Sequence, residues 1–174
     1  MDAPAKLSED QFDIAIAYDG TWLHQGVAMT RAPLVRLFET VLQRDAAGAY
    51  WLITPAERGR IAVADAPFVI TGWRLEGAGD TQTLTLTDNL GREQVVDAAH
   101  PLTLRVPNTG GGVFVPYLQL GGGIEARIAT AVYYDLVDAA LAMTGAQGGP
   151  DDTGRLLIAS CGVMHPLGMM TEGA

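Results

Sequence analysis

The stretch "YWLITPAERGRIAVADAPF", residues 50–68, contains two apolar runs separated by a charged turn and followed by Pro67. Short apolar runs bounded by proline and charged residues are typical of buried strands. Proline disfavours helical backbone at the residue before it, so we expect the second run to end at Ala66. The stretch therefore predicts a strand pair, with Glu57, Arg58 and Arg60 on or beside the turn.

The residues before this stretch predict a hairpin and a helix. The segment "FDIAIAY", residues 12–18, alternates apolar with polar or small residues, and "DG" then leads into the strand-like "TWLH". Residues 31–44 predict a helix, because Pro33 suits a first helical turn. Its apolar stripe consists of Leu34, Leu37, Phe38, Val41 and Leu42.

After Pro67 the pattern changes to an antiparallel meander. The segments "FVITGWRLEG", "TQTLTLTD", "EQVVD" and "LTLRV" are strand-like and are separated by turn residues. Residues 125–143 predict the longest helix, and "RLLIAS" and "GVMHP" predict the last strands. The stripe of this helix consists of Ile124, Ile128, Val132, Leu136, Ala139, Ala140 and Met143.

Both ends of the chain show the order strand, helix, strand, strand, at similar spacing. This order favours an internal duplication, although many α+β proteins have it without one. We therefore predict an α+β protein with antiparallel sheets and two halves, residues 1–65 and 66–174, joined at "ADAPF".

The charge excludes some partners. The chain has 174 residues, with 11 Lys+Arg against 20 Asp+Glu, which gives a net charge of −9 and disfavours binding to duplex nucleic acid. One cysteine, Cys161, excludes an internal disulfide. No signal peptide is visible and no apolar run approaches the ~18 residues of a membrane span, so we predict a cytoplasmic protein.

No catalytic or metal signature stands out. His24, His100 and His165 lack the spacing of zinc ligands, and "ASCG" around Cys161 is not a nucleophile elbow. Glu125 follows the glycines at 121–123 and would repel phosphate there. We therefore predict neither cofactor nor metal, and we favour a protein that is not an enzyme over a hydrolase or reductase using Cys161 or His24.

The arginines are distributed unevenly. Five of them lie between residues 31 and 60, where only Glu39, Asp45 and Glu57 oppose them. Either these arginines form surface ion pairs, each contributing about 0–1 kcal/mol, or some of them bind an anion. The five are Arg31, Arg36, Arg44, Arg58 and Arg60.

Four motifs, in this order and spacing, resemble the bacterial family called domain of unknown function 1285. They are "DGTWLHQG", "RAPLVRLF", "YWLITPAERGRIAVADAPFV" and "GGGIEARIATAVYYDLV". The resemblance implies a duplicated core and a C-terminal half like a pleckstrin-homology barrel. It also implies a groove between the halves for a nucleotide-like ligand, with a role in signalling. The family has no established catalytic residues to transfer.

Together these observations predict a non-enzymatic module that binds a small anionic, nucleotide-like ligand where the halves meet. The alternative is a protein-interaction scaffold that uses the pleckstrin-like half. The predicted ligand-binding residues are Trp22, Arg31, Thr54, Glu57, Arg58, Arg60, Asp65, Phe68 and Tyr134.

Overall fold

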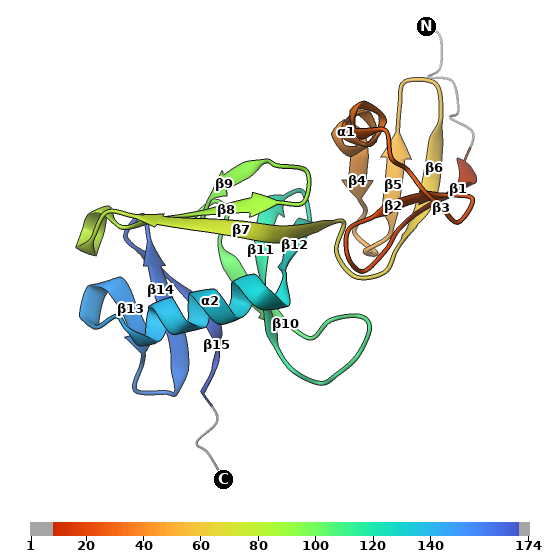
Figure 1. The fold of residues 1–174 in the computed structure, drawn as a ribbon. Helices are drawn as coiled ribbons and strands as arrows, with labels where there is room; N and C mark the ends of the chain where they lie inside the picture. The colour runs from red at the N-terminus through yellow and green to blue at the C-terminus, as the bar shows by residue number, and fades with distance from the viewer. Residues whose placement is uncertain (1–8, 171–174) are drawn as a thin grey trace, which may run out of the picture. The chain divides into compact units, whose positions relative to one another are not determined.

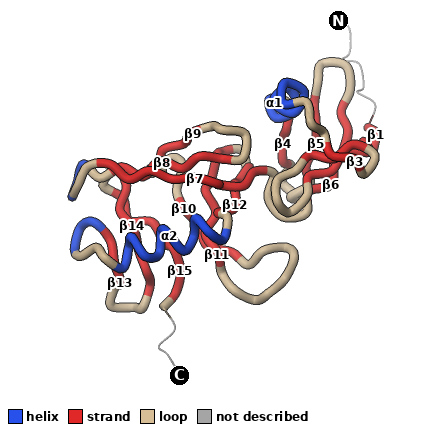
Figure 2. Tube along the Cα trace, viewed as in Figure 1, coloured by secondary structure: helices blue, strands red, loops and turns tan. Residues whose placement is uncertain are grey.

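The computed structural model describes residues 9–170 and divides the chain into two compact units (Figure 1). Unit 1 contains the described residues as far as Pro67, together with Gly122–Ile124. Unit 2 contains Phe68–Gly121 and the described residues from Glu125 onward. Strands dominate both units, as the tube drawing shows (Figure 2). In the described range, no helix is long and apolar enough to cross a membrane.

Unit 1 is built on a six-stranded sheet, sheet A, with strand order β3-β2-β1-β6-β5-β4. The predicted hairpin is confirmed, because β1 and β2 pair antiparallel. The prediction of purely antiparallel sheets is wrong, because β1 and β6 pair parallel. The elements are β1 (Glu9–Ile16), β2 (Trp22–His24), β3 (Val27–Ala28), α1 (Ala32–Thr40), β4 (Leu42–Arg44), β5 (Tyr50–Ile53) and β6 (Arg58–Val63).

Helix α1 is shorter than the predicted helix over residues 31–44. It ends at Thr40, and Leu42–Arg44 instead forms β4, paired antiparallel with β5. The turn between these strands is closed by Asp45, whose Oδ1 accepts hydrogen bonds from the backbone N–H groups of Ala47 and Ala49. Pairing with β5 and the turn closed by Asp45 thus favour a strand at residues 42–44, although the apolar spacing of this segment also fits a helix.

The apolar stripe predicted for this helix is largely at the surface. Leu34 and Leu37 are 37% and 59% exposed, and within α1 only Val35 is buried. The core of unit 1 comes mainly from the sheet, since alternate side chains of a strand point to one face. Its buried apolar residues are Ile16, Trp22, Val35, Tyr50, Leu52, Ile61 and Ala66.

Gly59 lets β1 and β6 approach closely. A Cβ atom placed on Gly59 would lie 2.3 Å from the ring of Phe12, which is nearer than real Cβ contacts come. Gly59 therefore has a packing role, and its φ is not among the positive φ angles of the chain. Because side chains alternate along a strand, Arg58 and Arg60 both point to the face opposite Phe12.

Unit 2 contains a six-stranded sheet, sheet B, with order β10-β11-β12-β7-β8-β9, and a three-stranded sheet C, with order β13-β14-β15. Three strands of the predicted meander are present as β7-β8-β9, but the fourth, "LTLRV", pairs with β11 at the other edge of the sheet, and β7 also pairs parallel with β12. The elements are β7 (Phe68–Glu76), η1 (Gly79–Thr81), β8 (Thr83–Asp88), β9 (Glu93–Val95), β10 (Leu102–Arg105), β11 (Val115–Gly121), β12 (Ile124–Ile128), α2 (Thr130–Leu141), η2 (Gly145–Gln147), β13 (Gly148–Pro150), β14 (Arg155–Ser160) and β15 (Val163–Met169).

The predicted helix over residues 125–143 is also partly a strand. Its first residues form β12, which follows β11 after a turn, and Gly122 and Gly123 have positive φ angles of 58° and 77° in that turn. Left-handed backbone suits glycine and turns the chain sharply. The helix begins only at Thr130, after the extended Ala129. The buried face of α2 is Val132, Leu136 and Ala140, all from the predicted stripe.

The two ends of the chain, in which the sequence favours an internal duplication, differ in strand pairing. Strands β5 and β6 belong to the same sheet as β1 and β2, whereas β14 and β15 form sheet C with β13 alone. The chain is thus a mostly β protein of α+β character, with two α-helices in its described part.

Buried polar side chains join sheets B and C. Ser160 Oγ, at the end of β14, accepts a hydrogen bond from the backbone N–H of Leu84 and donates one to the carbonyl of Val96. Gln82 Nε2 donates to the carbonyls of Gln147 and Ala159, both at 2.8 Å. These bonds link segments more than sixty residues apart, and helix α2 packs against β7, β13 and β14.

We predict that Gly59→Ala destabilises the protein by about 1–3 kcal/mol, because the new methyl group overlaps the Phe12 ring. The measurement is urea unfolding followed by circular dichroism. Gly72→Ala is the matched control, since Gly72 also lies in a strand and a Cβ there meets Thr87 at an ordinary 3.5 Å. Equal stability of the two variants would contradict the packing role of Gly59.

We further predict a loss of stability in mild acid that depends on His165. This side chain is 1% exposed, and its Nδ1 accepts a hydrogen bond from the backbone N–H of Leu102. Burial lowers the pKa of His165 below the ordinary 6.5, against smaller opposite effects of Ser160 and Asp97. As the pH falls, the unfolded chain therefore binds the proton first. The contribution of His165 to the free energy of unfolding is fully present above pH 6.5 and is lost as the pH drops toward the native pKa.

The test is the urea midpoint between pH 7.5 and pH 5 for the wild type, His165→Leu and His24→Gln. His24 is exposed, so His24→Gln should keep the wild-type pH dependence, whereas His165→Leu should show a shallower one. Parallel curves for the wild type and His165→Leu would contradict the prediction.

Candidate functional site

The outer face of sheet A carries an aromatic ring between cations. The strand register places Gln43, Trp51, Arg60 and Gln11 in one row across β4, β5, β6 and β1. The opposite face of the same strands is buried, with Tyr50, Leu52, Gly59 and Ile61. We call the side chains of Trp51, Arg58 and Arg60 the arginine face.

Arg58 and Trp51 stack on each other. The guanidinium carbon of Arg58 lies 4.2 Å from the centroid of the Trp51 ring, within the range of a cation–π contact. The indole Nε1–H of Trp51 donates a hydrogen bond of 2.8 Å to Asp45 Oδ2. This bond and the backbone N–H of Ala49 lower the pKa of Asp45, and the charge of Arg60 contributes in the same direction. The tryptophan ring is therefore fixed on both sides.

Arg60 presents an exposed positive charge beside this stack. Its backbone carbonyl accepts a hydrogen bond from Gln11 Nε2. Among the side chains described for residues 11–170, no carboxylate forms an ion pair with its guanidinium. The exposed guanidinium of Arg60 therefore gives this face a positive charge that can attract an anion.

Thr54 and Glu57 build the turn that connects β5 and β6. The backbone N–H and the Oγ1 hydroxyl of Thr54 both donate to the carbonyl of Glu57, and Thr54 Oγ1 accepts from the backbone N–H of Glu57. The two residues hold the turn beside Arg58, and the Glu57 side chain is exposed.

Arg31 precedes helix α1 and lines a shallow hollow of about 250 Å³ together with His24, Val27 and Leu34. A helix start can hold an anion when its backbone N–H groups are available. Here the N–H groups of Leu34 and Val35 already donate to the carbonyl of Arg31, and Pro33 has none. This hollow is therefore a weaker anion site than the arginine face.

The remaining predicted residues lie elsewhere. Trp22 is 2% exposed in the core of unit 1 and stacks on Phe38, and Asp65 is 1% exposed. In unit 2, Phe68 is 2% exposed beneath the guanidinium of Arg92, and Tyr134 on α2 is 62% exposed. The structure thus groups Thr54, Glu57, Arg58 and Arg60, whereas a site shared by all nine residues stays a prediction.

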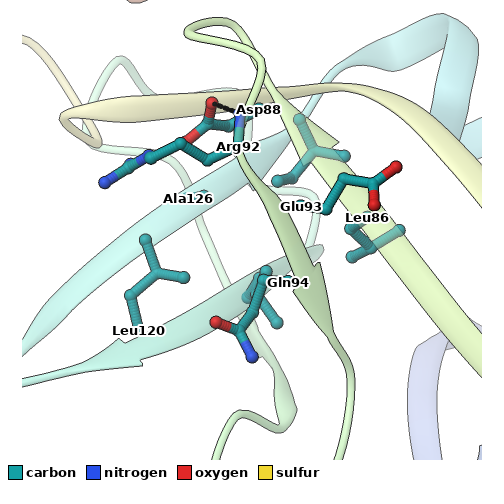
Figure 3. Close-up of a pocket in the computed structure, with 9 residues that line it drawn as sticks. Leu86, Asp88, Arg92, Glu93, Gln94, Leu120 and Ala126 are labelled. Carbon is teal, nitrogen blue, oxygen red and sulfur yellow. Dashed lines mark hydrogen bonds and ion pairs between the residues drawn. The ribbon is translucent and has the colours of Figure 1, made fainter. Parts of the chain in front are cut away.

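Unit 2 has a pocket of about 190 Å³ formed by strands of sheet B (Figure 3). Its walls are apolar, and its polar side chains come from the end of β8 and from the β8–β9 turn and β9. The lining residues are Ile70, Leu86, Asp88, Arg92, Glu93, Gln94, Leu118, Leu120 and Ala126.

The charged side chains that line this pocket already have ion-pair partners within the protein. Asp88 Oδ2 lies 2.6 Å from Arg92 Nη2, and Asp88 Oδ1 accepts from the backbone N–H groups of Leu90 and Arg92 (Figure 3). Glu93 is ion-paired with Arg74 at 2.8 Å. Two carboxylates and one arginine line the pocket, so it is less suited to an anion than the arginine face.

Sequence reasoning missed two features. Trp51 was not selected as a site residue, although the period-two alternation of β5 and β6 places it beside Arg60. The pocket was also missed. Asp88 and Arg92, four residues apart in the turn "DNLGR", were the one available signal for its ion pair.

The comparisons with known proteins agree on one family. Residues 4–66 match "Domain of unknown function (DUF1285), N-terminal domain", and residues 67–167 match "Protein of unknown function (DUF1285), C-terminal domain". The chain belongs to the DUF1285 family.

Two crystal structures of DUF1285 family proteins resemble this chain. The protein from Silicibacter pomeroyi DSS-3 is 31% identical with a TM-score of 0.80, and the alignment covers 97% of this chain and 90% of that one. The protein from Shewanella baltica OS155 is 25% identical with a TM-score of 0.56, over 72% of this chain and 91% of that one. No curated protein matches the chain. Within the described residues, no group of three or more His, Cys, Asp or Glu side chains could hold a metal ion.

We predict that Asp88→Ala destabilises the protein by about 1–3 kcal/mol, because two backbone N–H groups and Arg92 lose their acceptor. Asp88→Asn is the matched variant, since its amide oxygen keeps an acceptor for the backbone N–H groups of Leu90 and Arg92, and only the interactions with the Arg92 side chain are lost. It should cost less than Asp88→Ala in urea unfolding. Equal losses would show that the backbone bonds contribute nothing.

Proposed function

We propose that this DUF1285 protein is a non-enzymatic module that binds a small anionic ligand through the arginine face, and that the ligand is nucleotide-like. The observation that carries the proposal is the exposed guanidinium of Arg60, which has no ion pair with any side chain described for residues 11–170, next to the Arg58–Trp51 stack. Guanidinium groups form forked hydrogen bonds with phosphate and carboxylate.

The expected affinity is modest. A charge-assisted hydrogen bond contributes about 1.5–3 kcal/mol, and the exposed guanidinium of Arg60 offers one or more. A base stacked on the Arg58–Trp51 pair would add about 1–3 kcal/mol. Micromolar binding requires about 8 kcal/mol, so we expect dissociation constants between micromolar and millimolar.

The chemistry of the face favours binding over catalysis. Its functional groups are two guanidiniums and an indole, which donate hydrogen bonds but accept none. The carboxylate of Asp45 is already engaged by Trp51, Ala47 and Ala49, and its lowered pKa makes it a poor proton acceptor. Reversible binding of this kind suits a role in signal transduction, with unit 2 as a pleckstrin-homology-like partner domain.

The experiment is isothermal titration with a panel of nucleotides, including cyclic and signalling nucleotides, and with inorganic phosphate. We expect Arg60→Gln to weaken the binding of the best nucleotide about tenfold or more, because one charge-assisted contact is lost. Arg58→Gln should weaken it further, since it also removes the stacked guanidinium.

Arg74→Gln is the control, because Arg74 is exposed but already paired with Glu76 and Glu93. It should bind as the wild type does. Absence of heat from every nucleotide and from phosphate up to millimolar concentration would overturn the proposal, and so would equal binding by wild type and Arg60→Gln.

A protein-interaction scaffold is the alternative function. It is favoured by the loop between β10 and β11, where Val113 and Phe114 are 68% and 53% exposed. Exposed large apolar side chains in a cluster often mark a contact surface. Under this alternative, protein partners captured by the wild type would persist in an Arg58→Gln, Arg60→Gln double variant and be lost in Phe114→Ser.

A further inference from the structure

Unit 2 has a second hollow, distinct from the pocket of sheet B. It is a groove of about 460 Å³ along β10 and β15, which approach each other but belong to different sheets (Figure 1). We call it the β10–β15 groove. Its lining residues are Leu102, Thr103, Leu104, Phe114, Arg155, Pro166 and Met169.

The walls of this groove are apolar and partly open to solvent. Phe114 is 53% exposed and Met169 is 55% exposed. Leu102 is buried, and Leu104 and Pro166 are half-buried. The phenyl ring and the thioether therefore stand at the surface around an apolar floor. Covering them would remove apolar area from water, which is the main driving force for binding apolar ligands.

Arg155 is the one charged residue that lines the groove. Its backbone N–H and carbonyl bond to Asp151, but among the side chains described for residues 11–170 its guanidinium has no hydrogen-bond or ion-pair partner. The hydroxyl of Thr153 and the backbone N–H of Arg155 lower the pKa of Asp151 most, and the charge of Arg155 adds a smaller effect in the same direction. Arg155 therefore places a positive charge beside the apolar groove.

From this combination we infer that the β10–β15 groove binds a monocarboxylate with an unbranched apolar chain. The carboxylate pairs with the guanidinium of Arg155, and the chain lies against Leu104, Phe114 and Met169. Charge complementarity selects the head group, because a guanidinium beside apolar walls fits one negative charge followed by methylene groups. The volume falls in the range of about 300–1,000 Å³ that is typical of small-molecule sites.

The pocket of sheet B supports no comparable inference. Its carboxylates Asp88 and Glu93 are ion-paired with Arg92 and Arg74, so the charged groups of its lining already have partners without a ligand. The β10–β15 groove and the arginine face are made by different strands, so binding at one can fail while binding at the other succeeds.

The test is isothermal titration of the full chain with hexanoate, octanoate and decanoate below their micelle concentrations. Each buried methylene should tighten binding about fourfold, so affinity should rise about fifteenfold between successive members. Decanol has the same tail without the charge. We expect Arg155→Gln to weaken decanoate about tenfold or more and to leave decanol unchanged.

Arg74→Gln is the matched control, because Arg74 is another exposed arginine of unit 2 but is ion-paired with Glu76 and Glu93. It should bind decanoate as the wild type does, whereas Met169→Asp should weaken both decanoate and decanol. Affinity that does not increase with chain length would overturn the inference, as would equal decanoate binding by Arg155→Gln and the wild type. Tighter binding of an apolar peptide with a free C-terminal carboxylate would also overturn it, in favour of a peptide-docking surface.

Discussion

The close packing of Gly59 against Phe12 is the constraint on which the arginine face depends. Because residue 59 has no Cβ, β6 can lie beside β1 with the Phe12 ring over its backbone. Because side chains alternate between the two faces of β6, those of Arg58 and Arg60 on either side of Gly59 must point to the opposite face. A packing requirement of the core thus determines where two positive charges reach solvent.

The environment of each arginine decides what it can do. Arg74, Arg92 and Arg105 lie within ion-pair distance of carboxylates, so their guanidiniums are already bonded to negative charges within the fold. Arg60 and Arg155 have no ion pair in the described part of the chain, and each adjoins an aromatic or apolar surface. Both proposals rest on this difference, because a guanidinium that is not already bonded to a carboxylate can form charge-assisted hydrogen bonds with an anion.

Local patterns predicted the elements better than they predicted the pairing. The hairpin of β1 and β2, the meander of β7 to β9 and the buried stripe Val132, Leu136 and Ala140 follow from period and turn residues. The strands β4 and β12 were mistaken for helix, because their apolar spacing fits a helix too. They are strands because each pairs with another strand, β4 with β5 and β12 with β7. Such pairing is a non-local interaction that the apolar periodicity of a segment does not reveal.

By itself the sequence determined the family motifs, the acidic charge, the strand pair around "PAERGR" and the crowding of arginines near it. Only the tertiary structure decided that Trp51 joins Arg58 and Arg60, that Trp22 and Phe68 are buried, and that Arg155 borders an apolar groove. The physical reason is that composition and spacing determine which charged and aromatic side chains are present and which of them share a face of a strand. Burial and ion pairing, in contrast, depend on neighbours that are distant along the chain.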